Sequence, residues 1–227
     1  MRLSVCDRNS TTKSGQSGTN LFCSSCVSAC QRSLLTQEAP TRSFFPEWLD
    51  QFPDLTLQEM EACDRLRTRY QYYQAEGAIT ESTVNLIMVA PILELLGLYD
   101  PSYLIKGEKY VSIEIEDKDQ SLDGLIDVLV LQNRLWFILL ETKRYGFSVM
   151  QALPQTLSYM IANSEDGNAS YGLITTVEDY LFVKLNPQTR EYDISDKFTL
   201  STRRDNQFHT VIQILKQLIS LVQAPSS

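Results

Sequence analysis

The chain has 227 residues, of which 43% are hydrophobic and 10% aromatic, which suits one packed globular domain rather than two. Its net charge of −8 disfavours a surface that binds nucleic acid over its whole extent, because phosphate affinity rests on Lys and Arg, but it is compatible with a local metal site. The longest apolar run, Leu86 to Leu98, contains Pro91 and Glu94 and is too short for a transmembrane helix. We find no secretory signal and therefore expect a cytoplasmic protein without a membrane partner.

Residues 1–43 are rich in Ser, Thr, Gln, Asn and Gly and lack hydrophobic periodicity, which predicts a disordered N-terminal segment. Four of the five cysteines fall in this segment, and an odd total does not describe a disulfide framework. Cys23, Cys26 and Cys30, with Cys6 as a distant fourth thiolate, form an alternative zinc site. Structural zinc sites usually combine two well-formed ligand pairs, so we favour the flexible segment.

Two helices are predicted next. Apolar residues recur at helical spacing from Leu55 to Glu76, and Gly77 is expected to end this helix. Thr80 is suited to cap a second helix from Glu81 to about Leu96. Pro91 lies inside this second helix, so a kink or break is expected there. The expected apolar stripe of the second helix consists of Leu86, Val89, Ala90, Leu93 and Leu96.

From residue 103 the hydrophobic pattern changes to a period of two. It predicts a half-buried strand from Tyr103 to Glu116, then two more apolar and central strands, Leu125 to Leu131 and Leu135 to Thr142. The remaining predicted elements are a helix, two or three strands and a closing helix: Ser148 to Ala162, Tyr171 to Thr176, Tyr180 to Leu185, Tyr192 to Ile194, and Asp205 to Val222. This order predicts an α/β fold with a central mixed β-sheet flanked by helices.

The polar stretch from Gln132 to Arg134 joins two strands and predicts a hairpin loop. If the hairpin is centred near Arg134, Asp127 faces Glu141, with Cβ atoms roughly 4.5–5.5 Å apart. Glu141 and Lys143 then share one face, because side chains alternate along a strand. Two such carboxylates repel each other unless a cation lies between them, and oxygen ligands suit Mg²⁺ or Mn²⁺. We therefore expect Asp127 and Glu141 to bind a metal and Lys143 to activate water.

Asp127, the hairpin and Glu141-Thr142-Lys143 resemble the motif of the PD-(D/E)xK nucleases, the restriction-endonuclease-like superfamily. The likeness covers about residues 81–186 and is strongest to the nuclease domain at the N-terminus of the motor (R) subunit of type I restriction enzymes. It implies a restriction-endonuclease-like core within a single domain over residues 44–223, and metal-dependent cleavage of DNA. It also implies that Glu81 reaches the metal through water and that Gln155 and Tyr159 support the site and the DNA.

The sequence departs from the family at two points. Ile126 stands where many members have Pro, and the chain has no Walker-type phosphate loop, so it resembles the nuclease module alone. Besides DNA, this leaves open a separate motor or specificity subunit and a homodimer as partners, and RNA as the substrate. The competing hypothesis is a catalytically silent accessory or nucleic-acid-binding protein that keeps this fold. A separate alternative for the charges themselves is that Glu141 and Lys143 are solvated at the end of a strand and Asp127 forms a simple salt bridge.

Other charged residues are set aside. The sole histidine, His209, has no partner in view, which argues against a triad hydrolase. Arg65, Arg67 and Arg69 are expected to be solvated, because alternate residues of a helix do not share one face.

Overall fold

The computed structural model describes residues 3–5, 36–41, 44–49, 52–77, 79–101, 103–115, 120–131, 135–139, 149–162, 168–202 and 205–223. Its helices are α2 (Leu57–Glu76), α3 (Glu81–Val84), a π-helical segment (Asn85–Val89), α4 (Ala90–Leu95), α5 (Leu153–Ala162) and α6 (Gln207–Gln223), with 3-10 turns at Pro46–Trp48 and Val149–Ala152. Its strands are β1 (Leu3–Val5), β2 (Gln37–Glu38), β3 (Leu104–Ile115), β4 (Gln120–Leu131), β5 (Leu135–Leu139), β6 (Ser170–Thr175), β7 (Asp179–Asn186), β8 (Glu191–Ile194) and β9 (Phe198–Thr199).

The main sheet has the strand order β2-β8-β7-β6-β5, and β9 pairs with β7 outside this path. β5 and β6 are parallel, and so are β2 and β8, whereas β7 pairs antiparallel with both β6 and β8. Parallel strands need a crossover connection, and α5 lies in the chain between β5 and β6. A second, antiparallel sheet has the order β1-β3-β4, and its strand β4 lies beside β5. The predicted central mixed sheet flanked by helices is confirmed.

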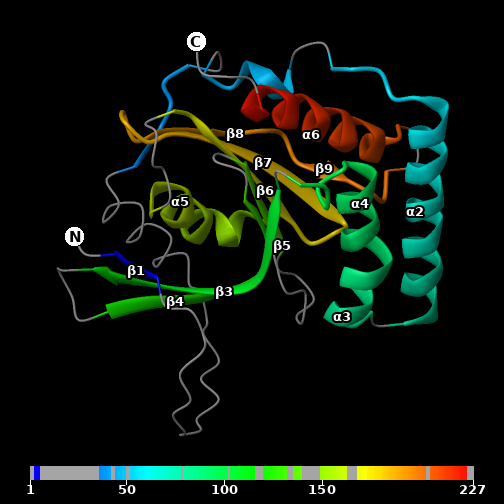
Figure 1. The fold of residues 1–227 in the computed structure, drawn as a ribbon, viewed down its shortest axis with the longest axis horizontal. Coiled ribbons are helices and arrows are strands. Elements are labelled where there is room, and N and C mark those ends of the chain that lie inside the picture. The colour runs from blue at the N-terminus through cyan, green and yellow to red at the C-terminus, as the bar shows by residue number, and fades with distance from the viewer. Residues whose placement is uncertain are drawn as a thin grey trace, which may run out of the picture.

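Strands β6 and β7 are covered on both faces, which explains why they are apolar without a clear alternation. Tyr180 and Phe182 of β7 pack in the core formed with α2, α4 and α6, whereas Leu181 and Val183 pack in the core formed with α5. Accordingly, α5 and α6 lie on opposite sides of the sheet (Figure 1). This layering places α5 against β6 and β7.

Helix α2 begins and ends on local signals. Thr56 Oγ1 accepts a hydrogen bond from the Glu59 amide (3.2 Å), and Glu59 Oε2 accepts one from the Thr56 amide (2.7 Å). This reciprocal capping box satisfies two amides that a helix N-terminus leaves without partners. At the other end Gly77 adopts φ 134°, which side chains disfavour. The predicted helix is therefore confirmed, with its start shifted past Thr56.

The apolar stripe predicted for the second helix is wrong at its first position, since Leu86 is 74% exposed. The buried residues are Val84, Ile87, Met88, Val89, Ile92 and Leu93. The buried pair Ile87-Met88 is followed by the buried pair Ile92-Leu93 five residues later, one residue more than the four-residue step that keeps two positions on one face of a regular α-helix. A π-turn absorbs the additional residue, since the Ala90 amide donates to the Asn85 carbonyl five residues earlier. The two halves of the helix can then both face the core.

Pro91 and Arg69 complete this π-turn. Pro91 has no N–H and could not donate to the Ile87 carbonyl four residues earlier, as an α-helix would require. Arg69 of α2 takes its place, with Nη1 donating to that carbonyl at 3.1 Å. The break predicted at Pro91 is thus present as a π-helical segment, and its hydrogen bonding is completed from a neighbouring helix.

The segment Phe44–Leu49 is anchored on the sheet by a half-buried ion pair. Lys184 Nζ of β7 lies 2.6 Å from Glu47 Oε1, and both side chains are at most 15% exposed. Tyr171 donates to the same oxygen at 2.7 Å, and Lys184 also donates to the Phe44 carbonyl at 2.8 Å. The Lys184 ammonium lies within 6 Å of three aromatic ring centres, so the cation is held by rings as well as by charge.

Two short strands fall within residues 1–43. β1 pairs with β3, and β2 pairs with β8, where the Ala39 amide extends the ladder to the Tyr192 carbonyl at 2.8 Å. Cys6, Cys23, Cys26 and Cys30 lie outside the described residues, so flexibility and zinc binding in this segment stay predictions. Within the described part, no helix has both the length and the apolar character needed to cross a membrane.

Candidate functional site

The predicted site residues are distributed over the elements expected to carry them. Glu81 is the first residue of α3, Asp127 lies in β4, and Gln155 and Tyr159 lie in α5. The side chains of these residues fall outside the described part of the chain. Glu141 and Lys143 lie entirely outside it, as does the hairpin loop from Gln132 to Arg134.

Asp127 lies well inside a paired strand. The register of β4 against β3 aligns Val128 with Gly107 and Ile126 with Lys109, on either side of Asp127. On its other side β4 lies beside β5, which ends at Leu139, two residues before Glu141. Asp127 therefore lies in β4, and Glu141 follows the neighbouring strand β5 by two residues in the sequence. That Asp127 faces Glu141 directly stays a prediction, because the described pairs do not include Glu141.

The end of β5 lies next to a hydrogen-bonded turn. Leu139 aligns with Thr175, the last residue of β6, and the turn from Thr175 to Asp179 begins there. Thr175 Oγ1 donates to the Asp179 carbonyl at 2.9 Å and accepts from the Val177 amide at 2.7 Å. Val177 has φ 71°, which is strained for a β-branched residue, and its side chain is 1% exposed. These hydrogen bonds and this burial offset the strain and hold the turn that follows β6, next to the end of β5.

Helix α5 packs unusually close to β6. A Cβ atom added at Gly172 would lie 3.3 Å from Met160 Sδ and 3.4 Å from Thr156 Cγ2, so the glycine permits the approach. Thr156 is buried and its hydroxyl donates to the Ala152 carbonyl, four residues earlier, at 2.9 Å. Pro154 lies in the first turn of α5, where a helix needs no N–H donor, so it does not interrupt the helix. The part of α5 that carries Gln155 and Tyr159, one turn apart, therefore lies close against β6.

The cysteine and tyrosine buried between α2 and the sheet are unsuited to nucleophilic chemistry. Burial, with a smaller contribution from Asp64 and Glu59, raises the pKa of the Cys63 thiol to about 12. Burial and the nearby carboxylates of Glu178 and Asp179 raise the pKa of Tyr70 to about 12. Both groups stay protonated at neutral pH, and a thiol rather than a thiolate is a poor nucleophile.

His209 has partners that the sequence did not reveal. Its Nε2 lies 3.0 Å from Asp64 Oδ1 of α2 and 2.9 Å from Asn206 Nδ2. Asp64 precedes His209 by 145 residues, so only the packing of α2 on α6 brings them together. The group ties the two helices at the surface.

Comparison with known proteins adds no relative. No family model, no curated protein and no solved structure matches this chain.

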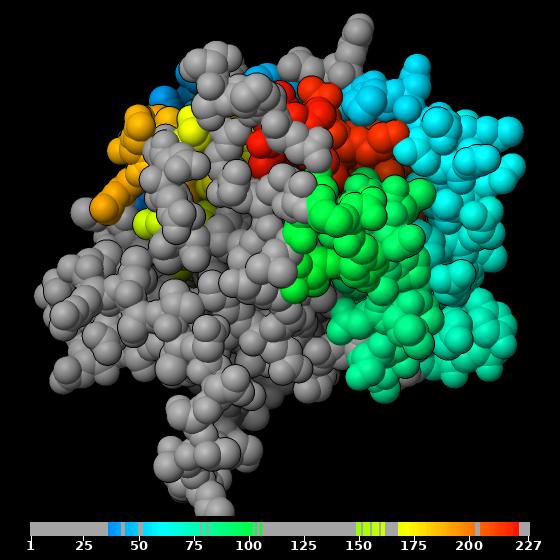
Figure 2. Space-filling view, viewed as in Figure 1, coloured from blue at the N-terminus to red at the C-terminus, as the bar shows by residue number. Residues whose placement is uncertain are grey.

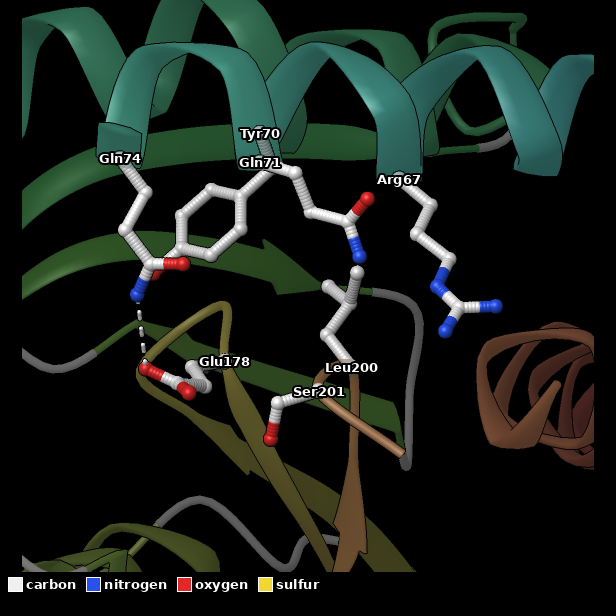
Figure 3. Close-up of a pocket in the computed structure, with 7 residues that line it drawn as sticks. All are labelled: Arg67, Tyr70, Gln71, Gln74, Glu178, Leu200 and Ser201. Atoms are coloured by element: carbon white, nitrogen blue, oxygen red, sulfur yellow. Dashed lines mark hydrogen bonds between the residues drawn. The ribbon is translucent and has the colours of Figure 1, made fainter. Parts of the chain in front are cut away.

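A small polar pocket of about 210 Å³ lies between α2 and the turn that precedes β7. Gln74 Nε2 donates across it to Glu178 Oε2 at 3.4 Å, and Arg67 extends along one side (Figure 3). Arg67 Nη2 also donates to the Thr202 carbonyl, so this guanidinium is committed to the backbone. The lining residues are Arg67, Tyr70, Gln71, Gln74, Glu178, Leu200 and Ser201. The pocket is a polar contact between elements rather than a reactive centre. Arg67 is bonded to a backbone carbonyl, Gln74 is bonded to Glu178, and Tyr70 stays protonated.

The three arginines of α2 differ from the expectation that all are solvated. Arg67 and Arg69 donate to the backbone carbonyls of Thr202 and Ile87, whereas Arg65 is exposed and lies 3.9 Å from Glu61. Sequence spacing did not indicate these bonds, because the accepting carbonyls belong to distant segments. In the part of the chain with described side chains, no group of three or more His, Cys, Asp or Glu residues could hold a metal ion. The predicted ligands Asp127, Glu141 and Glu81 do not belong to that part.

Proposed function

We propose that this chain is a metal-dependent nuclease that hydrolyses phosphodiester bonds in DNA. The observation that carries the proposal is the order and neighbourhood of its elements: α3, β3, β4, β5, α5 and β6, with β4 beside β5 and β5 parallel to β6 (Figure 1). Asp127 lies in β4, and Glu141 and Lys143 directly follow β5. This arrangement agrees with the resemblance to PD-(D/E)xK nucleases and supports a restriction-endonuclease-like core.

In this proposal each residue has a separate role. Asp127 and Glu141 hold Mg²⁺ or Mn²⁺ through carboxylate oxygens, and Glu81, at the start of α3, assists through water. The bound cation lowers the pKa of a water molecule and neutralises charge that develops on the phosphate. Lys143 orients the attacking water and favours its deprotonated form. Gln155 and Tyr159, on consecutive turns of α5, brace the site or contact the DNA backbone.

The test is cleavage of plasmid DNA in the presence of Mg²⁺. Lys143→Ala is expected to lose activity by about a hundredfold or more, the range typical of a group that assists proton transfer. Lys197→Ala is the matched control, because Lys197 is a 54% exposed lysine that pairs with Asp179 at the surface. Both variants should keep the circular dichroism spectrum of the wild type. Equal activity of Lys143→Ala and the wild type would remove Lys143 from the mechanism and, with it, the proposed site.

The net charge of −8 favours a second candidate, an accessory protein that keeps the fold and the metal site without turnover. Calorimetric titration of Mn²⁺ into the wild type and Asp127→Asn separates the two candidates. A binding signal that Asp127→Asn abolishes, together with cleavage, supports the nuclease. The same signal without cleavage of DNA or RNA supports the accessory role, and no signal from the wild type contradicts both.

A further inference from the structure

One face of α2 combines exposed arginines with exposed aromatic rings. Tyr72 and Tyr73 are 62% and 40% exposed, and their rings meet edge to face with centroids 5.7 Å apart. Arg69 and Arg65 lie one and two turns earlier, respectively, on the same face, since residues three and four apart are neighbours on a helix. An open hollow of about 470 Å³ lies over this part of the helix and is lined by Asp64, Arg65, Thr68 and Arg69. We call the face formed by Arg65, Thr68, Arg69, Tyr72 and Tyr73 the α2 face.

From these contacts we propose that the α2 face binds a single-stranded stretch of nucleic acid. Guanidinium groups bind phosphates, and tyrosine rings offer flat surfaces on which bases stack. Arg65 is the arginine of this face whose guanidinium is exposed to solvent, whereas Arg69 already donates through Nη1 to the Ile87 carbonyl. Stacking on a protein ring requires an unpaired base, because the faces of paired bases are already covered by their neighbours in the duplex. The aromatic half of the face therefore selects a single strand over a duplex.

The carboxylates near the α2 face do not prevent this binding. Asp64 Oδ1 is turned to α6, where it accepts from Asn206 Nδ2 at 2.7 Å and lies 3.0 Å from His209. Glu61 lies 3.9 Å from Arg65 with both side chains more than half exposed, a pair too weak to compete with a phosphate. Glu61 and Glu76 lie beyond the two ends of the stretch from Arg65 to Tyr73, so neither interrupts it in the sequence.

The position of the α2 face connects it to the proposed catalytic site. Helix α2 forms one margin of the molecule, with α3 beside its C-terminal end (Figure 2). Only residues 77–80 separate the end of α2 from Glu81, the first residue of α3. A strand bound along the α2 face would be led toward Glu81. The inference thus rests on the proposed nuclease function for its purpose, and names an unpaired strand as the substrate class.

Binding is tested separately from cleavage by fluorescence anisotropy in EDTA. The probe is a fluorescein-labelled oligothymidylate, compared with the same strand annealed to its complement. The wild type should bind the single strand more tightly than the duplex. The double variant Tyr72→Ala/Tyr73→Ala should lose about tenfold or more in affinity, because each base that stacks on a tyrosine ring contributes to binding and the variant removes both rings. Tyr99→Ala is the matched control, because Tyr99 is a 50% exposed tyrosine in the turn that follows α4.

The contribution of the arginine charge to binding is measured from the dependence of affinity on salt concentration. Arg65→Gln should reduce the slope of log affinity against log salt by about 0.7, the value for one phosphate contact with a single strand. Three results would overturn the inference: no binding by the wild type, a preference for the duplex, or equal affinities of the double variant and Tyr99→Ala. A wild type that is dimeric while the double variant is monomeric in size-exclusion chromatography would also overturn it, by making the face a protein interface. Single-strand binding without cleavage in Mg²⁺ would instead contradict the proposed nuclease function and still support the α2 face as a binding surface for single strands.

Discussion

Helix α2 and the helical stretch α3–α4 lie side by side, joined by a short link, yet they are stabilised in different ways (Figure 1). Helix α2 is continuous, starts with the capping box of Thr56 and Glu59, and ends at Gly77. The stretch α3–α4 contains a π-turn, and the Ile87 carbonyl within it is satisfied by Arg69 from α2. The first helix is therefore encoded by residues next to it in sequence, and the second depends on its neighbour.

This difference has a physical origin. A cap acts within one turn of the helix that it ends, so it can be recognised in the sequence. A π-turn arises because two apolar stripes out of phase must both face one core, and the phase is set by the elements against which they pack. Glu81 begins the irregular stretch, and π-turns are frequent at functional sites. Three substitutions can test how far the two helices differ.

The largest effect is expected in the core after the π-turn. Ile92 is 2% exposed, and Ile92→Ala should lower the free energy of unfolding by about 2–5 kcal/mol, because it leaves a cavity. Leu86→Ala, its control, should change it by less than about 0.5 kcal/mol, since Leu86 is 74% exposed. Urea denaturation followed by circular dichroism measures both. Similar losses for the two variants would contradict the π-turn and restore the regular stripe.

A smaller effect is expected where α2 supports the π-turn. Arg69→Ala removes the donor to the Ile87 carbonyl and should cost about 1–3 kcal/mol, the penalty for a polar group left without a partner. Arg65→Ala should cost less than about 0.5 kcal/mol, because its pair with Glu61 is exposed. Amide exchange measured by NMR should also accelerate around the π-turn in Arg69→Ala alone. Unchanged exchange there would show that α3–α4 holds its geometry without α2.

The smallest effect concerns the cap of α2 and depends on pH. Burial opposes ionisation of Glu59, but the hydrogen bonds from Lys216 and from Thr56 outweigh it, so the pKa of Glu59 is lowered below 4.5. A lowered folded-state pKa contributes stability above the unfolded-state pKa, and this stability is lost as the pH falls through the folded-state value. Glu59→Gln should therefore cost about 1 kcal/mol at pH 7, and less as the pH falls below about 4.5. Thermal unfolding of both proteins between pH 3 and pH 7 measures the difference. A constant difference over this range would mean that the charge of Glu59 does not stabilise the cap.

The sequence by itself determined the elements whose signals are local. The period of apolar residues and the capping residues located α2, α6 and strands β3 to β8, with boundaries shifted by a few residues. The same local patterns put Glu81 at the start of a helix, Asp127 in a strand, and Gln155 and Tyr159 in the helix after the hairpin. The meeting of Asp127 with Glu141 and Lys143 is still a prediction, because it depends on the register between β4 and the chain beyond β5.

Only the tertiary structure decided which residues meet across distant segments. It paired Lys184 with Glu47, turned Asp64 toward His209, and committed Arg67 and Arg69 to carbonyls of other elements. It also exposed Leu86, an apolar residue that helical periodicity had placed in the core. The physical reason is that hydrophobic periodicity records only whether a position suits burial, whereas the phase of a helix and the partners of its charges are set by the elements that pack against it.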